Sequence, residues 1–245
     1  MTTKSAPVRL SDLPVQEKVR QTLTFQRDTG SITIRNLTGR LLSTDERLAI
    51  EGACHTVAAF TRERIVQRLE GIDLVDMGEA LQWGGTYNPY SRVVRVNLAG
   101  LRRLKKPDLG DYAPYFTGRP GVSLFDLTLA HEMAHAMDIG TLAEAVSLGI
   151  DIKHHAWFAI NGRTNSFSYF QQGLGWRHRV IGDGKLAHNT WRLEEKDKAL
   201  APTRFAAEMP HEDFAETFAI MALGGDTSMF TNRAQLLRSL IQPAS

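Results

Sequence analysis

Residues 129–138 read Leu129-Ala130-His131-Glu132-Met133-Ala134-His135-Ala136-Met137-Asp138 and contain the pattern His-Glu-x-x-His. Residues four apart on an α-helix lie on one face, so His131 and His135 would present their imidazoles one turn apart. Two imidazoles in that relation can both bind one Zn²⁺ ion. Glu132 would then reach a water molecule in the open metal position and act as its general base.

The neighbouring residues favour a helix over this stretch. Ser123 followed by Asp126 matches the capping-box pattern of a helix start. Leu124 and Leu127 follow at helical spacing, and Gly140 is typical of a helix end. The sequence therefore predicts a capped helix that carries both histidines. The alternative is a chance match of the pattern on an ordinary packed helix.

The composition indicates a globular protein without a strongly charged partner. The 245 residues are 42% hydrophobic and 23% charged, which suits one globular domain with a sizeable core. A net charge of +2 implies no strong attraction to nucleic acid or to an anionic membrane. Cys54 is the only cysteine, so neither an intrachain disulfide nor a four-cysteine zinc site can form.

The chain also shows no targeting or membrane segment. No apolar region follows the polar N-terminal residues as it would in a secretory signal, and no run of about 18 apolar residues occurs. We therefore expect a protein without a membrane partner that is cytoplasmic or is exported without a cleaved signal peptide.

We expect an α+β protein with an N-terminal arm or cover at residues 1–40 and a single domain at residues 41–245. Within the arm, the pattern predicts a helix over residues 12–25 and a strand over residues 31–37, where the residue types alternate. Ser43 opens a second capping box, which predicts a long amphipathic helix that ends at Gly71.

Residues 84–97 predict two strands joined by a turn at Asn88-Pro89. The first strand carries Gly85 and Thr86 and precedes the histidine helix. It could serve as an open sheet edge that pairs with an extended peptide substrate. The alternative is an ordinary edge hairpin. Later in the chain, residues 180–186 predict a further hairpin with an Asp-Gly turn.

A catalytic zinc site needs three protein ligands and one open position. The metzincin pattern would place Gly and His after the second histidine, where Asp138 and Thr141 stand instead. The Glu-Gly-Cys motif of peptide deformylase is not matched by residues 51–54, which contain one additional residue. The remaining solution is a glutamate from a later helix. Glu212 and Glu216 lie four apart on such a helix, although acidic residues in a first helical turn are also favoured by the helix dipole alone.

Taken together, residues 131–138 and 212–219 resemble the two motifs of gluzincin metallopeptidases, in particular the catalytic domain of anthrax lethal factor and related bacterial zincins. The resemblance implies a zincin-like fold and a zinc-dependent endopeptidase that acts on proteins or peptides. It implies the metal ligands His131, His135 and Glu212 and the general base Glu132.

Two further carboxylates are expected to support the metal site. The resemblance implies that Glu216 orients a ligand imidazole, as metal sites generally require. Asp138 lies near the C-terminus of the histidine helix, where the helix dipole disfavours a carboxylate. We therefore expect Asp138 to have a partner close to the site.

One position departs from the family pattern. Relatives usually carry a tyrosine about seven residues before the ligand glutamate, and here that residue is Phe205. Phenylalanine has no hydroxyl donor, and loss of one oxyanion donor costs about 3 kcal/mol of transition-state stabilisation. We expect Phe205 to lie on the substrate side of the pocket. Two alternative functions remain: a non-catalytic zincin-fold component of a larger assembly, such as a phage particle, and an injected toxin or effector protease.

Overall fold

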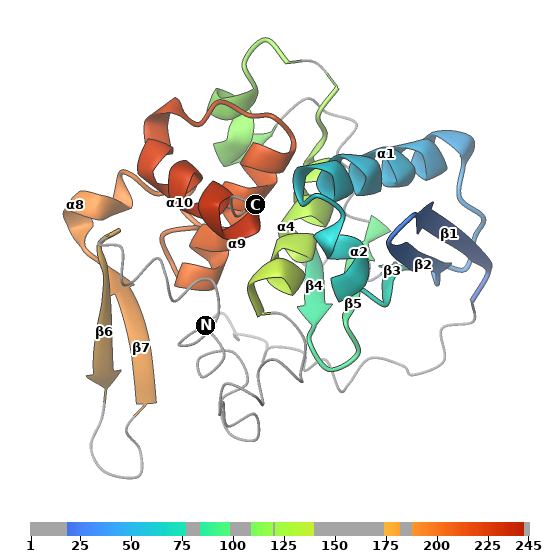
Figure 1. Ribbon diagram of the computed structural model, residues 1–245, viewed down its shortest axis with the longest axis horizontal. Coiled ribbons are helices and arrows are strands. Elements are labelled where there is room, and N and C mark those ends of the chain that lie inside the picture. The colour runs from blue at the N-terminus through green and yellow to red at the C-terminus, as the bar shows by residue number, and fades with distance from the viewer. Residues whose placement is uncertain are drawn as a thin grey trace, which may run out of the picture.

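The computed structural model describes residues 19–76, 84–98, 109–119, 121–139, 174–181 and 188–242 of the chain. The described part is of mixed α and β structure, as expected, with a five-stranded mixed sheet, several helices and a separate two-stranded hairpin (Figure 1). Among the described residues, none of the helices combines the length and apolar character needed to cross a lipid bilayer.

The main sheet has the strand order β1-β2-β3-β5-β4. The inner pairs β2–β3 and β3–β5 are parallel, whereas the outer pairs β1–β2 and β4–β5 are antiparallel. Its strands are β1 (Gln21–Arg27), β2 (Gly30–Asn36), β3 (Gly71–Val75), β4 (Gly85–Asn88) and β5 (Val93–Asn97). Strands β1 and β2 fall in the described portion of the predicted N-terminal arm, and they belong to this sheet.

The two faces of the sheet differ in polarity because side chains alternate along each strand. One row in register is apolar and fully buried, and it consists of Ile34, Ile72 and Val94. The row beside it on the opposite face is charged. There, buried Asp73 places its two carboxylate oxygens 2.6 Å from Arg35 Nε and 3.6 Å from Arg95 Nε. The apolar face therefore packs on helices, and the charged row ties β2, β3 and β5 together.

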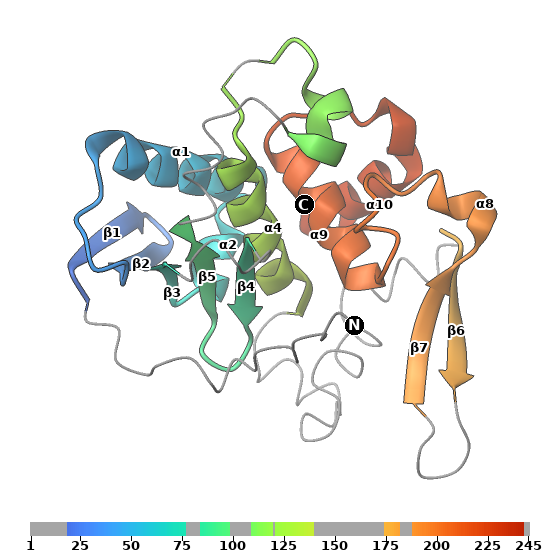
Figure 2. The same cartoon turned by 180° about the vertical axis from the view of Figure 1, so that it is seen from behind.

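The helices are α1 (Thr44–Phe60), α2 (Arg64–Arg68), α4 (Leu124–Ile139), α8 (Glu195–Lys198), α9 (Pro210–Ala222) and α10 (Thr231–Ile241), with 3₁₀ helices η2 (Gly110–Phe116) and η4 (Ser228–Phe230). Figures 1 and 2 both show α4 in the middle, between the sheet on one side and α9 with α10 on the other. The hairpin of β6 (Trp176–Ile181) and β7 (His188–Leu193) lies beyond α9.

Several local predictions are confirmed. The strand predicted at residues 31–37 is β2, and the two strands predicted at residues 84–97 are β4 and β5. Ser43 caps α1 through a capping box with Glu46. The hairpin predicted near residue 180 exists as β6 and β7, although its turn lies outside the described residues.

The helix predicted over residues 12–25 is wrong in the part of that range that the structure describes. Residues 21–25 belong to strand β1, and residues 12–18 lie outside the described part. Strand β1 pairs with β2 along its whole length, and the buried side chains of Phe25 and Ile32 face each other in that pairing. Cross-strand pairing supplies backbone hydrogen bonds and burial together, which outweighs a weak local helical pattern.

The single long helix predicted to end at Gly71 is also wrong. The chain breaks between α1 and α2, where Arg62 and Glu63 adopt left-handed backbone angles with φ of 48° and 65°. The Glu63 carboxylate accepts a 2.8 Å hydrogen bond from Arg27 Nε in β1. This contact from a distant strand stabilises the break, and Gly71 begins strand β3 instead of ending a helix.

Candidate metal centre

Helix α4 fixes the two histidines. At its start, Ser123 Oγ accepts a 3.2 Å hydrogen bond from the Asp126 backbone N–H, and the Asp126 carboxylate accepts a 2.8 Å bond from the Ser123 backbone N–H. This is the capping box expected from the sequence. His131 and His135 are both buried on the side of α4 that packs on α9.

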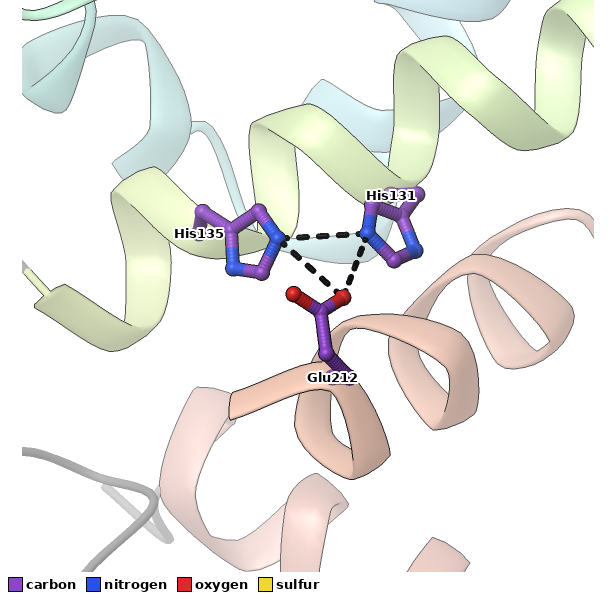
Figure 3. A group of neighbouring side chains, drawn as sticks. All are labelled: His131, His135 and Glu212. Carbon is purple, nitrogen blue, oxygen red and sulfur yellow. Dashed lines mark hydrogen bonds and ion pairs between the residues drawn. The ribbon is translucent and has the colours of Figure 1, made fainter. Parts of the chain in front are cut away.

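The start of helix α9 supplies the third residue of the group. Pro210 occupies the first helical position, where its missing N–H is harmless, and Glu212 follows in the first turn. Glu212 Oε2 lies 3.0 Å from His131 Nε2 and 3.7 Å from His135 Nε2. The two Nε2 atoms are 3.2 Å apart, so three potential ligand atoms converge between the helices (Figure 3).

The spacing of these atoms suits a small metal ion. Tetrahedral zinc with bonds of about 2.1 Å holds its ligand atoms about 3.4 Å apart, and the three measured separations lie on either side of that value. Glu212 Oε2 is buried and forms no well-aligned hydrogen bond, although it lies within ion-pair distance of two imidazole nitrogens. A buried carboxylate oxygen without a hydrogen bond is costly. A metal ion would satisfy it, so the group can hold a metal ion.

The charge states of these groups also suit metal binding. Burial would raise the pKa of Glu212, but its interactions with His131 and His211 outweigh burial and lower that pKa well below its usual range. Burial lowers the pKa of His135 to about 3. Glu212 is therefore ionised and His135 neutral, which are the forms that bind a metal.

In the metal-free protein, the pKa of His131 shifts in the opposite direction to that of His135. Burial alone would lower its pKa, but the carboxylates of Glu212 and Glu216 raise the pKa of His131 well above its ordinary value. Metal binding at His131 Nε2 consequently requires the release of a proton.

Glu216 orients the His131 ring from the side that faces away from Glu212. Glu216 Oε1 lies 2.9 Å from His131 Nδ1, the ring nitrogen that does not face Glu212. The Tyr112 hydroxyl donates a 2.7 Å hydrogen bond to the same oxygen, and the Thr203 hydroxyl donates a 3.0 Å bond to Glu216 Oε2. Both oxygens of Glu216 are thus held in place, so the imidazole is held as well. No local sequence signal predicts the roles of Tyr112 and Thr203, because tertiary packing brings them to Glu216 from 104 and 13 residues away.

Glu132 lies against the edge strand of the sheet. A Cβ atom at Gly85 would be only 2.6 Å from Glu132 Cγ and 3.0 Å from Glu132 Oε1, so a glycine is needed where β4 passes this side chain. Burial raises the pKa of Glu132 to about 8. The structure therefore brings the expected base and the glycine of the expected substrate edge into contact, with Thr86 as the next, half-buried residue of β4.

Two other expected site residues are placed as follows. The Phe205 ring centroid is 5.9 Å from that of His131, with an interplanar angle of 30°, and the side chain is 46% exposed. Phe205 thus presents a partly exposed apolar surface beside the metal group.

Asp138 is buried in the last turn of α4 and is not one of the three residues whose ligand atoms converge. Arg68 Nη1 donates to the backbone oxygen of Met137 at 3.4 Å and brings positive charge to that helix end.

A buried ion pair anchors the start of α9 to α10. Arg233 Nε lies 2.9 Å from both carboxylate oxygens of Asp213, the residue directly after Glu212. Trp176 Nε1 of the hairpin donates a 2.9 Å hydrogen bond to the same carboxylate. Both charged side chains are almost completely buried, so the helix turn that carries Glu212 is tied to two other elements.

Comparisons with models of protein families, with curated proteins and with solved structures gave no match. The resemblance to gluzincins consequently rests on the two sequence motifs alone.

Proposed function

We propose that this protein is a zinc-dependent metalloendopeptidase that hydrolyses protein or peptide substrates. The observation that carries the proposal is the convergence of His131 Nε2, His135 Nε2 and Glu212 Oε2 from two packed helices. Two imidazoles and one carboxylate are a donor set used by catalytic zinc sites, which leave a fourth position open. The motif resemblance to gluzincins points to the same reaction.

In this proposal, His131, His135 and Glu212 would hold a zinc ion, which would supply Lewis acidity and lower the pKa of a water molecule. Glu132 would accept a proton from the attacking water and deliver a proton to the leaving amine. In the metal-free protein, burial raises the pKa of Glu132, which favours the protonated form that would deliver a proton to the leaving amine. Glu216 keeps the His131 ring in the orientation that directs Nε2 toward the metal.

The edge strand β4 is the proposed substrate site. It ends the described five-stranded sheet, and Gly85 brings its backbone against Glu132. An extended peptide that pairs with β4 would run past the Glu132 carboxylate, so β-strand addition would place a peptide carbonyl near the base. Phe205 would offer an apolar surface to a side chain of that peptide.

A second candidate function is that of a non-catalytic, zincin-fold structural or interaction component of a larger assembly, such as a phage particle. The specific observation in its favour is Phe205, which stands beside His131 without the hydroxyl that the family resemblance leads one to expect. The toxin or effector hypothesis follows from the lethal-factor resemblance alone, and it concerns the target of the same proposed reaction.

The test is metal content combined with proteolysis. We expect the purified protein to bind zinc, to cleave casein or members of a peptide library, and to lose that activity with a chelator and regain it with zinc. Stable zinc binding without cleavage of any substrate would favour the non-catalytic candidate. Failure to bind zinc would refute the peptidase proposal and would also favour the non-catalytic candidate.

A further inference from the structure

His211 is a buried histidine at the metal group that the proposed function does not use. Its Nε2 atom lies 3.0 Å from Glu212 Oε1, and its ring centroid is 5.7 Å from that of His135. An ionised carboxylate can only accept hydrogen bonds, and a glutamate must be ionised to bind a metal. His211 Nε2 therefore carries the hydrogen and donates it to Oε1.

The two oxygens of Glu212 consequently have different surroundings. Oε1 faces His211, whereas Oε2 faces the two imidazole nitrogens of the metal group. A glutamate can bind a metal through one oxygen or through both. If both oxygens bound the metal here, Glu212 would take up the position that a catalytic site leaves open for water.

We propose that His211 is a positioning residue that holds Glu212 as a one-oxygen ligand and thereby keeps the fourth metal position open. The inference rests on the proposed metal site but goes beyond it, because it assigns separate roles to the two oxygens of one ligand. The hydrogen bond from His211 engages Oε1 and directs Oε2 toward the metal.

A matched pair of variants separates the hydrogen bond from the packing of the ring. Glutamine and methionine have similar length and shape, but only glutamine carries an N–H donor. His211→Gln and His211→Met would be compared with the wild type and with His55→Met, which changes an exposed histidine of α1. Zinc affinity would be measured by competition with a chelator, and the visible spectrum would be recorded after substitution with Co²⁺, because absorption weakens as its coordination number rises.

We expect His211→Met to bind zinc about 10- to 100-fold more weakly, as is typical when a partner of a metal ligand is lost. Its Co²⁺ bands should weaken, because Glu212 then binds through both oxygens. His211→Gln should keep the affinity and spectrum close to those of the wild type, and His55→Met should match the wild type in both.

The outcomes distinguish the two proposals. If the wild type binds zinc but His211→Gln and His211→Met give equal affinities and equal spectra, the positioning role of His211 is wrong and the proposed metal site stands. If the wild type binds no zinc, the proposed function and this inference fail together. Thermal unfolding of each variant identifies any loss of folding. A folded His211→Gln variant whose Co²⁺ bands differ from those of the wild type would also overturn the inference.

Discussion

Substitution of Gly85 by alanine tests whether the edge strand and the proposed base work as one unit. The added Cβ atom would lie 2.6 Å from Glu132 Cγ and 2.8 Å from the Arg95 backbone oxygen. Carbon atoms in contact prefer a separation of about 3.5–4.0 Å, so Glu132 or β4 must move by roughly 1 Å. A misplacement of about 1 Å can cost about 100-fold in rate.

We therefore expect Gly85→Ala to lower kcat on casein or a peptide substrate by about 100-fold. Zinc affinity should stay close to that of the wild type, because the atoms nearest to the added Cβ belong to Glu132 and Arg95 and not to the three proposed ligands. Metal content, steady-state kinetics and thermal unfolding would be measured on the same preparations, so that a folding defect is separated from a defect in the reaction.

Gly52→Ala is the matched control. Gly52 is exposed within α1, and a Cβ atom there would meet no atom within 4 Å. Alanine is favoured over glycine in a helix by roughly 0.5–1 kcal/mol, so this variant should be slightly more stable and fully active. Wild-type kcat in a folded Gly85→Ala protein would refute the reasoning, because Glu132 could then move freely without loss of the reaction.

Four further substitutions test the roles at the metal group. Glu132→Gln should keep zinc but lose hydrolysis by about 100- to 10,000-fold, because it removes the base and none of the ligands; a parallel loss of zinc in metal analysis would contradict this role. Glu212→Ala should weaken zinc binding in chelator competition more than Glu216→Ala, for which about 10- to 100-fold is typical of an orienting partner; the reverse order would make Glu216 the ligand. Phe205→Tyr should raise kcat with little change in KM, since a hydroxyl beside His131 would bond the developing oxyanion mainly in the transition state; unchanged kinetics would count against an oxyanion role at this position.

The parts of the fold that follow local rules could be predicted from the sequence. Ser123 and Asp126 specify the start of α4 through a capping box, and the turn at Asn88-Pro89 separates β4 from β5. These signals involve residues within a few positions of each other, so the sequence alone contains both partners. The same holds for the two histidines, whose spacing is set by one helical turn.

The predictions that failed concern residues whose partners lie elsewhere in the chain. Gly71 resembles a helix stop, but a Cβ atom there would lie 2.8 Å from the Thr33 backbone oxygen of the neighbouring strand. The glycine is therefore required by the close approach of β2 and β3, which no local pattern reveals. Tyr112 and Thr203 meet at Glu216 for the same reason, since tertiary packing alone brings η2, the segment before α9 and α9 together.

The buried pair of Asp213 and Arg233 has a consequence for any shortened version of the chain. A protein cut before α10 would retain the Asp213 carboxylate in the interior without its counter-charge, which costs about 3–5 kcal/mol where one partner of a buried pair is removed. The residue left without its counter-charge would be the immediate neighbour of Glu212 in α9. We therefore expect loss of α10 to weaken metal binding at the proposed site, although α10 contributes none of its three ligands.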